Sequence, residues 1–403
     1  MRTAILLLFL LSASWAVSFG QSRLMIERAW EIEADGGYDF SGALAANDGN
    51  QRIASVAADP GMGIVYGEDG SIRVTYHGNG SAKLHASAIV DVSYDTNITT
   101  DARPSFIPIG SGGLASADYA ISDQAREIAH GDSSLRTIRD LTEWVHGNMS
   151  YDADYFGRLV PAATIFRDRK GVCVEYTHLF MAMARSLGFD ARYVAGYVYA
   201  GAWQPHAWAE VYIPGYGWLP VDPTLEQIGI LDSSHFALSK GADGSDVYDL
   251  LVSEGPDASL SVEDLMHSEY FRDDQKGVSI SIDIDDDLGS AEVSVENSRA
   301  EYVFGAYSLS LPEGFGGTRD SVLLLEPSMT KRMFYGLNRS LFLGGAGYPI
   351  PIKASFNDAS SARSFSLEPA KGPGIGYAED LDAPFFVIAA IVIIVTLTAR
   401  RWW

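Results

Sequence analysis

The pattern of apolar and polar positions divides the chain into three regions. From about residue 23 to 105, short apolar runs alternate with Gly, Asn and Asp turns, and Ile72, Val74 and Tyr76 fall on one face. This alternation is typical of strands joined by tight turns. From about 117 to 250 the spacing of the apolar positions is first that of helices and then again that of strands. Alternation resumes near 275, which predicts a second β-domain of immunoglobulin-like sandwich type.

The middle region is expected to be α+β. Helices are predicted over 117–130, over 134–148, and from Cys173 to a left-handed C-cap at Gly188. Each of the last two helices has an apolar stripe: Leu135, Ile138, Leu141, Thr142 and Val145 on one, and Tyr176, Leu179, Phe180, Met183 and Leu187 on the other. Predicted strands at 192–199, 207–213 and 218–221 follow, so we expect a helix packed on an antiparallel sheet.

The N-terminus has the features of an export signal. Arg2 precedes an apolar run over 4–17, and the small residues Ser18 and Gly20 suit the positions before a signal-peptidase cleavage site. We therefore interpret residues 1–20 as a signal peptide.

Near the C-terminus, residues 383–399 form an uncharged, apolar run that is followed at once by Arg400 and Arg401. Seventeen residues would span roughly 26 Å as a helix, near the short limit for a bilayer. The arginines favour a cytoplasmic tail at 400–403 and a single-pass protein whose bulk lies outside the cell. A buried core helix, or a sorting tail that is exchanged for a lipid, is the alternative.

The chain is strongly acidic, with a formal net charge of −23. A protein of this charge repels phosphate backbones, so nucleic acid is not an expected partner. Asn-X-Ser/Thr sequons agree with a glycosylated exterior; they begin at Asn79, Asn97, Asn148 and Asn338. The oligomeric state stays open.

Cys173 is the only cysteine in the chain. A single thiol cannot form an intramolecular disulfide, which leaves an intermolecular bridge, a structural thiol or a reactive one. The unpaired N–H groups at the start of a helix stabilise a thiolate, and Gly171 lets the chain turn sharply just before it.

A reactive thiol also needs a base and a group that orients the base. His206 lies at the head of the strand predicted at 207–213, and Asp222 follows the next strand. Adjacent antiparallel strands joined by the Pro-Gly-Tyr-Gly turn can bring the two side chains together, with Cys173 packed over them. Taken singly, each residue also has a structural explanation: a buried thiol, a strand cap and an Asx-turn.

Three blocks in this region resemble the transglutaminase-like family of papain-like cysteine enzymes. They are LRTIRDLTEWVHGNMSYD, GVCVEYTHLFMAMARSLGFDARYVAGYV and HAWAEVYIPGYGWLPVDPT, in the family's order over roughly 117–230. The resemblance implies Cys173 as nucleophile, His206 as general base and acid, and Asp222 as the residue that orients the imidazole. The family's usual Ile-Pro after the helix is replaced here by Phe189 and Asp190, a loop variation outside the chemistry.

The resemblance also suggests two substrate-binding residues. Trp203 is similar in position to a tryptophan that walls the acyl channel in animal transglutaminases. Tyr151 is a candidate for a side-chain oxyanion donor beside the backbone N–H of Cys173.

The expected function is attack on a protein or peptide amide at the cell surface, through a thioester on Cys173. Water as acceptor gives a peptidase, amidase or deamidase, and a lysine amine gives a cross-linking transglutaminase; hydrolysis is preferred. The alternative is a non-catalytic adhesion or scaffolding protein that binds through its β-domains. No cofactor and no metal site are expected, because zinc-ligand spacing is absent and the acidic run over 283–289 does not fit an EF-hand loop.

The complete expectation is an α+β papain-like transglutaminase core, flanked by all-β domains and followed by a transmembrane helix. The predicted boundaries are a signal peptide at 1–20, a β-domain at 21–110, the core at 111–250, a linker at 251–274, a β-sandwich-like domain at 275–370, a linker at 371–382, the membrane helix at 383–399 and a tail at 400–403.

Overall fold

The computed structural model describes residues 20–367, apart from gaps. These gaps are 48, 94–97, 103–112, 200, 230, 232–233, 246, 273–276, 286–289, 312–316, 337–347 and 358. Residues 1–19 of the expected signal peptide and the segments expected at 371–382, 383–399 and 400–403 lie outside the described residues. Within the described part of the chain, no helix has the length and apolar character needed to cross a membrane.

The first unit is a sandwich of two antiparallel sheets, ordered β15-β1-β6-β3 and β14-β2-β5-β4. Its strands are β1 (Gly20–Ala34), β2 (Gly37–Ala46), β3 (Gln51–Ala58), β4 (Gly63–Tyr66), β5 (Ser71–Asn79), β6 (Ala82–Ser93), β14 (Leu250–Ser253) and β15 (Ala258–Arg272). The predicted alternation in β5 is confirmed, because Ile72 and Val74 are buried. The large side chains of Trp30, Tyr38 and Phe40 fill the space between the two sheets.

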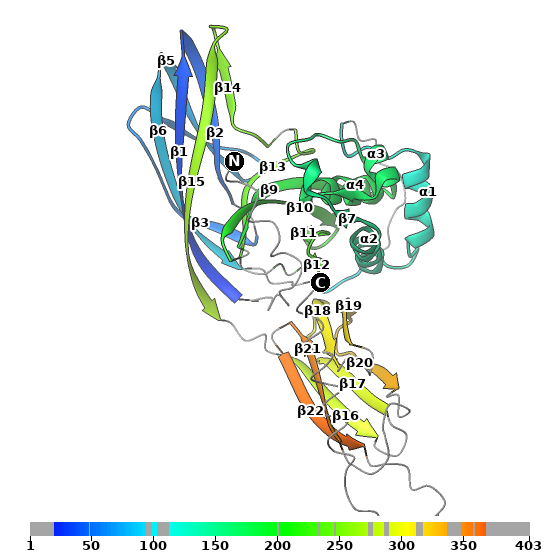
Figure 1. Ribbon diagram of the computed structural model, residues 1–403. Helices are drawn as coiled ribbons and strands as arrows, with labels where there is room; N and C mark the ends of the chain where they lie inside the picture. The colour runs from blue at the N-terminus through cyan, green and yellow to red at the C-terminus, as the bar shows by residue number, and fades with distance from the viewer. Residues whose placement is uncertain are drawn as a thin grey trace, which may run out of the picture.

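The sandwich is not contiguous in sequence. Residues 251–274, expected to be a linker, instead contain β15, which pairs with β1 along its whole length from Gly20↔Arg272 to Ala34↔Ala258. The strand escaped prediction because it lies at a sheet edge and its apolar alternation is interrupted by Glu263 and Asp264. The chain therefore leaves the sandwich, forms the middle unit and then returns to complete both sheets (Figure 1).

The middle unit is α+β, as predicted. Its helices are α1 (Tyr119–Ile128), α2 (Ser134–Asn148), α3 (Ala162–Asp168) and α4 (Cys173–Ser186), and its sheet has the order β12-β11-β10-β9-β13. The sheet strands are β9 (Ala191–Tyr199), β10 (Trp203–Ile213), β11 (Gly217–Asp222), β12 (Gln227–Ile228) and β13 (His235–Gly241). Two short segments, β7 (Ser150–Tyr151) and β8 (Lys170–Gly171), pair in parallel, and a 3₁₀ turn covers Ala153–Tyr155.

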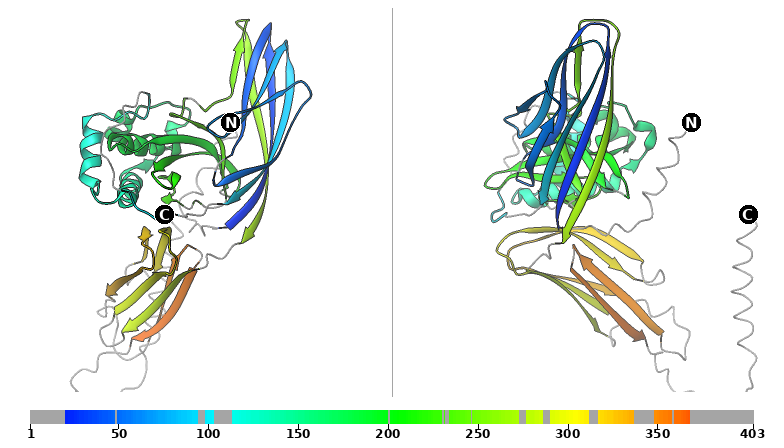
Figure 2. Two further views of the ribbon diagram at one scale, coloured as in Figure 1. Left: turned by 180° about the vertical axis from the view of Figure 1, so that it is seen from behind. Right: turned by 90° about the vertical axis from the view of Figure 1, so that its left-hand side faces the viewer.

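The five-stranded sheet lies between the helices and the N-terminal sandwich (Figures 1 and 2). Alternation along β10 explains this arrangement, because Ala207, Ala209 and Val211 join the helix-side core whereas Trp208 joins the sandwich core. The other three helices and the sheet surround α4, so it is buried on all sides rather than along one stripe. The predicted left-handed position after the helix is confirmed at Gly188, whose φ is +88°.

The last unit is a second all-β sandwich, as predicted. Its two sheets have the orders β16-β17-β20 and β19-β18-β21-β22. The strands are β16 (Val278–Asp285), β17 (Ser290–Asn297), β18 (Val303–Ser310), β19 (Thr318–Leu325), β20 (Thr330–Gly336), β21 (Tyr348–Phe356) and β22 (Ala359–Leu367). Ile282 is buried in the core between the sheets, and the alternating residues Val278, Ile280 and Ile284 pack against it.

Candidate active site

The start of α4 presents Cys173 as the first residue of the helix. The helix begins there because the carboxylate of Glu175 accepts the backbone N–H of Val172 at 2.9 Å, which closes the first turn. Gly171 fits this turn closely, since a Cβ at that position would lie 2.2 Å from the Cβ of Glu175. A glycine is therefore required for the chain to enter the helix at this angle.

The side chain of Thr177 ties this helix to the sheet. Its hydroxyl donates to the backbone carbonyl of Cys173 at 2.8 Å and lies 3.2 Å from that of Ala207. Ala207 is the neighbour of His206 on β10, so the helix start and the histidine are held in register with each other.

His206 and Asp222 are brought together as predicted from the hairpin. The Nε2 of His206 lies 2.7 Å from Oδ2 of Asp222, and the side chains are 7% and 0% exposed. The turn between β10 and β11 uses Gly215 and Gly217, both with positive φ. One detail differs from the prediction: β10 begins at Trp203, so His206 lies within the strand rather than at its head.

The environment fixes the charge of this pair. Burial alone would lower the pKa of His206, but the charge of Asp222 and hydrogen bonds with Asp222 and Cys173 raise it above the ordinary value. Burial alone would raise the pKa of Asp222, yet the imidazoles of His206 and His235 hold it well below its usual range. The pair therefore favours a carboxylate facing an imidazolium.

His235 is a functional-site residue that the sequence reasoning missed. Its Nε2 lies 3.1 Å from the same Oδ2 of Asp222, and its side chain is fully buried. A single histidine in an apolar strand usually has a structural role, and nothing in the local pattern around 235 distinguishes it. What marks His235 is its place on β13, the strand that borders β9. That pairing joins segments far apart in sequence, so the local pattern does not reveal it.

Among the described residues, the one cluster suited to holding a metal ion consists of His206, Asp222 and His235. Their ligand atoms lie within 4.8 Å of one another. However, the 2.7 Å separation of His206 from Asp222 is that of a direct hydrogen bond. Two atoms that share a zinc ion at ~2.1 Å lie roughly 3.3 Å apart when the site is tetrahedral. The geometry therefore favours a hydrogen-bonded network.

Cys173 and His206 both line a cavity of about 440 Å³. Its lining includes the loop over 155–159, where Phe156 and Leu159 are exposed, together with Tyr197 and Tyr248. Cys173 thus borders a space lined mainly by aromatic and aliphatic side chains, which suits a peptide segment.

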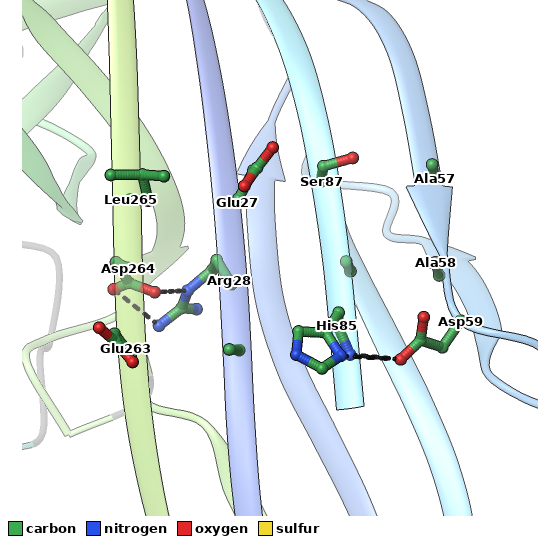
Figure 3. Close-up of a pocket in the computed structure, with 12 residues that line it drawn as sticks. Glu27, Arg28, Ala57, Ala58, Asp59, His85, Ser87, Glu263, Asp264 and Leu265 are labelled. Atoms are coloured by element: carbon green, nitrogen blue, oxygen red, sulfur yellow. Dashed lines mark hydrogen bonds and ion pairs between the residues drawn. The ribbon is translucent and has the colours of Figure 1, made fainter. Parts of the chain in front are cut away.

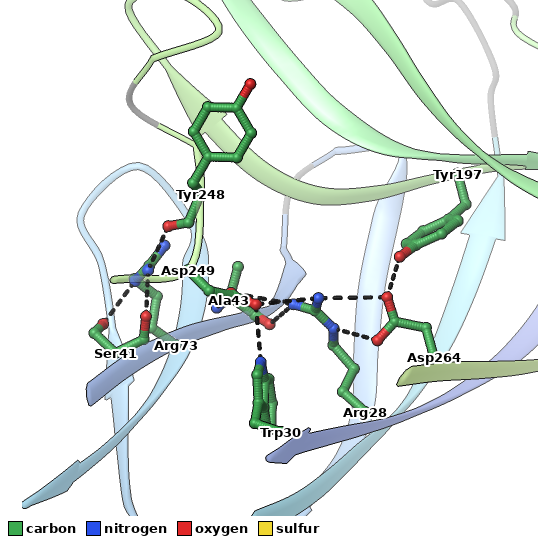
Figure 4. A network of polar contacts seen from close by, with 9 residues as sticks. All are labelled: Arg28, Trp30, Ser41, Ala43, Arg73, Tyr197, Tyr248, Asp249 and Asp264. Atoms are coloured by element: carbon green, nitrogen blue, oxygen red, sulfur yellow. Dashed lines mark hydrogen bonds and ion pairs between the residues drawn. The ribbon is translucent and has the colours of Figure 1, made fainter. Parts of the chain in front are cut away.

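The N-terminal sandwich supplies part of the cavity wall through Arg28, whose polar contacts are drawn in Figure 4. Its guanidinium forms ion pairs with Asp264 at 2.7 Å and Asp249 at 3.3 Å, and Asp264 also accepts the hydroxyl of Tyr197. We call these four residues the clasp. Because they come from β1, β9, β15 and the segment before β14, the clasp joins the sandwich to the sheet that carries His206.

A second cavity, of about 480 Å³, opens on the sheet β15-β1-β6-β3 (Figure 3). It includes the surface pair of His85 and Asp59, whose side chains are 3.1 Å apart and well exposed. Arg28 and Asp264 line it too, so the clasp reaches the second cavity as well. It lacks a cysteine, and its histidine, His85, is exposed, so the Cys173 cavity is the candidate active site.

Of the two predicted substrate-binding residues, Tyr151 lies close to Cys173. It pairs with Gly171 between β7 and β8. Burial and the nearby Cys173 raise the pKa of the Tyr151 phenol, which keeps its proton available for donation. Trp203 instead packs against Tyr199 and the core of the N-terminal sandwich, and it is not among the described residues that line the cavity. The channel role of Trp203 therefore stays a prediction.

His178, which lies five residues into α4, has a structural role. It is fully buried, it accepts the backbone N–H of Gly244 at 3.0 Å, and its ring packs near Tyr193. Burial lowers its pKa to about 4, so the imidazole is neutral.

Comparisons with known proteins place the segment that holds these residues in one superfamily. Residues 122–223 match the model of the transglutaminase-like superfamily. An uncharacterised protein of Mycobacterium tuberculosis is 27% identical over 146 residues, which cover 32% of this chain and 46% of that protein. The protein-glutamine gamma-glutamyltransferase of Pseudomonas aeruginosa is 29% identical over 126 residues, covering 27% of this chain and 18% of that enzyme.

The matched segments span about half the length of the mycobacterial relatives. Among solved structures, a candidate cysteine protease from Cytophaga hutchinsonii matches with a TM-score of 0.48 and 19% identity, covering 63% of this chain and 92% of that one. On the match to the family model, the segment that carries Cys173, His206 and Asp222 belongs to the transglutaminase-like superfamily.

Proposed function

We propose that the chain is a cysteine enzyme that cleaves or transfers protein or peptide amides through the triad Cys173, His206 and Asp222. The observation that carries the proposal is the buried carboxylate–imidazole pair placed beside a thiol at a helix start. A cysteine kept only for packing needs no such pair, and a scaffolding protein has no use for a base at the edge of an open cavity.

The proposed reaction has two halves. The Cys173 sulfur attacks the amide carbonyl carbon, and the imidazolium of His206 gives its proton to the nitrogen as the C–N bond breaks, which releases an amine or ammonia and leaves a thioester. His206 then takes a proton from the incoming water or amine, a new C–O or C–N bond forms, and the C–S bond breaks. Asp222 stabilises the imidazolium throughout.

The developing oxyanion needs donors near the nucleophile. As the first residue of α4, Cys173 has a backbone N–H without an intrahelical acceptor. The phenol of Tyr151, a residue whose backbone pairs with Gly171 and whose side chain lies near Cys173, is the second proposed donor.

Hydrolysis is the preferred outcome, because water competes with an amine unless it is excluded from the site. The cavity that contains Cys173 is open to the surface along the loop over 155–159, where Phe156 is 51% exposed. Mass spectrometry of a glutamine-containing peptide, incubated with the purified chain with and without an added amine, tests this. A mass gain of about 1 Da from deamidation, or a cleaved peptide, indicates hydrolysis; an amine adduct indicates transfer; an unchanged peptide contradicts the enzymatic proposal.

We further propose that the enzyme acts outside the cell, tethered through residues 383–399. The apolar run followed by Arg400 and Arg401 supports this topology. Protease treatment of intact cells should cleave the region around Cys173. If that region is cleaved after lysis but protected in intact cells, the proposed topology is wrong.

A further inference from the structure

Asp222 accepts hydrogen bonds from two histidines at one oxygen atom. The Nε2 of His206 lies 2.7 Å and the Nε2 of His235 lies 3.1 Å from its Oδ2. The proposed triad accounts for His206, but it assigns no task to His235.

The other carboxylate oxygen of Asp222 is occupied as well. Its Oδ1 accepts the backbone N–H groups of Thr224 at 2.8 Å and Leu225 at 3.1 Å. Four donors therefore surround the carboxylate, two on each oxygen. The terminal torsion of an aspartate is intrinsically broad, so these donors decide which way Oδ2 points.

The side chain of His235 is buried and packed outside the cavity that contains Cys173. It is fully buried at the start of β13, where it pairs with Val198 of β9, and its ring meets Trp208 edge to face at 5.3 Å. His206 lines the cavity that contains Cys173, whereas His235 is not among the described residues that line it. His235 can therefore affect a reaction at Cys173 only through Asp222 and His206.

We infer that His235 is a positioning residue: its Nε2–H fixes the Asp222 carboxylate so that Oδ2 meets His206, which keeps the imidazole aligned with Cys173. Without this donor, Oδ2 loses one of its two hydrogen bonds, and the carboxylate is free to turn toward Thr224 and Leu225. The bond to His206 then lengthens, and the imidazolium is less well stabilised. This inference rests on the proposed function.

The predicted kinetic consequence is specific. Replacing His235 by phenylalanine keeps a ring against Trp208 but removes the donor, so we expect kcat to fall roughly 10-fold or more, as for a lost charge-assisted hydrogen bond. KM should stay within about twofold, because the cavity lining is unchanged. His235→Gln restores an N–H donor and should recover most of kcat. A purely structural role would not distinguish these two variants by kcat at constant KM.

The experiment measures turnover of a glutamine peptide by the full chain, together with the melting temperature of each variant. His178→Phe is the matched control, since it also replaces a buried histidine by a ring but does not touch Asp222; its kcat should be unchanged. If His235→Phe does not fold, His235→Leu takes its place.

A double-mutant cycle completes the test. In the Asp222→Asn background, His235→Phe should cost little further activity, because the residue through which it acts is already altered. Equal kcat for wild type, His235→Phe and His235→Gln would overturn the inference while leaving the triad intact, whereas an inactive wild type would contradict the proposed function itself. Loss of wild-type activity in a chelator, with recovery on adding zinc, would also overturn it, because the three side chains would then hold an ion.

Discussion

The clasp makes a quantitative prediction about how the N-terminal sandwich and the unit that carries Cys173 depend on each other. Arg28 is 5% exposed, and its partners Asp249 and Asp264 are 10% and 14% exposed. Arg28→Met removes the cation, keeps the length of the side chain, and leaves two carboxylates facing each other in a largely buried site. Removing one partner of a buried ion pair costs about 3–5 kcal/mol.

The local contacts place the expected loss at the lower end of that range. Asp249 keeps two other donors, the indole N–H of Trp30 at 2.8 Å and the backbone N–H of Ala43 at 2.7 Å. Asp264 keeps the hydroxyl of Tyr197. We therefore expect the free energy of unfolding to fall by about 3 kcal/mol, a large share of the 5–15 kcal/mol typical of a folded domain.

Urea unfolding followed by circular dichroism measures this loss. Arg23→Met is the matched control on the same strand, because Arg23 pairs with Asp91 at the surface, and its midpoint should hardly move. Adding Asp264→Asn to Arg28→Met removes one unpaired charge and should restore part of the loss. KM should also rise in Arg28→Met, since Arg28 lines the Cys173 cavity. A midpoint equal to that of the control would refute the reasoning, since the carboxylates would then be solvated.

The remaining predictions concern the site itself. Cys173→Ala should abolish turnover and leave the melting temperature nearly unchanged, because the substitution removes a single sulfur atom at a cavity wall. Asp222→Asn should lower kcat by about 10⁴-fold, as in a Ser-His-Asp triad. The pKa of His206 is raised, so its imidazolium is fully present below about pH 6.5 and is lost as pH rises through the raised value. The kcat should therefore decline only at alkaline pH. A decline of kcat centred near pH 6.5 would contradict the pairing of His206 with Asp222. Glu175→Ala should destabilise the helix start by about 1 kcal/mol, whereas Glu175→Gln, which keeps an acceptor for Val172, should cost less in a thermal melt.

Sequence reasoning recovered the parts of the structure that depend on local periodicity and on a short-range hairpin. The stripe in α2 and the alternation in β16 are readable because each residue's environment follows from its neighbours in sequence. The contact of His206 with Asp222 could be predicted for the same reason, since one tight turn joins their strands.

The features that were missed depend on long-range pairing. β15 joins β1 across more than two hundred residues, and its polar edge hides the alternation that would have marked it as a strand. Arg28 reaches the cavity, and His235 reaches Asp222, only because the sandwich and β13 are placed against the sheet. No local signal encodes such placement, so single side chains at these positions look like ordinary surface or core residues.

The central claim is that Cys173 becomes covalently acylated, and intact-mass spectrometry tests it most directly. The chain is mixed with a glutamine peptide, quenched in acid within seconds, and digested to locate any adduct. The account predicts an acyl adduct on Cys173, with the mass of the peptide minus ammonia, or of its acyl fragment where a peptide bond is cleaved. The adduct should be released by hydroxylamine, as expected of a thioester, and absent from Cys173→Ala. Conversion of the peptide without an adduct on Cys173, or conversion that persists in Cys173→Ala, would contradict it.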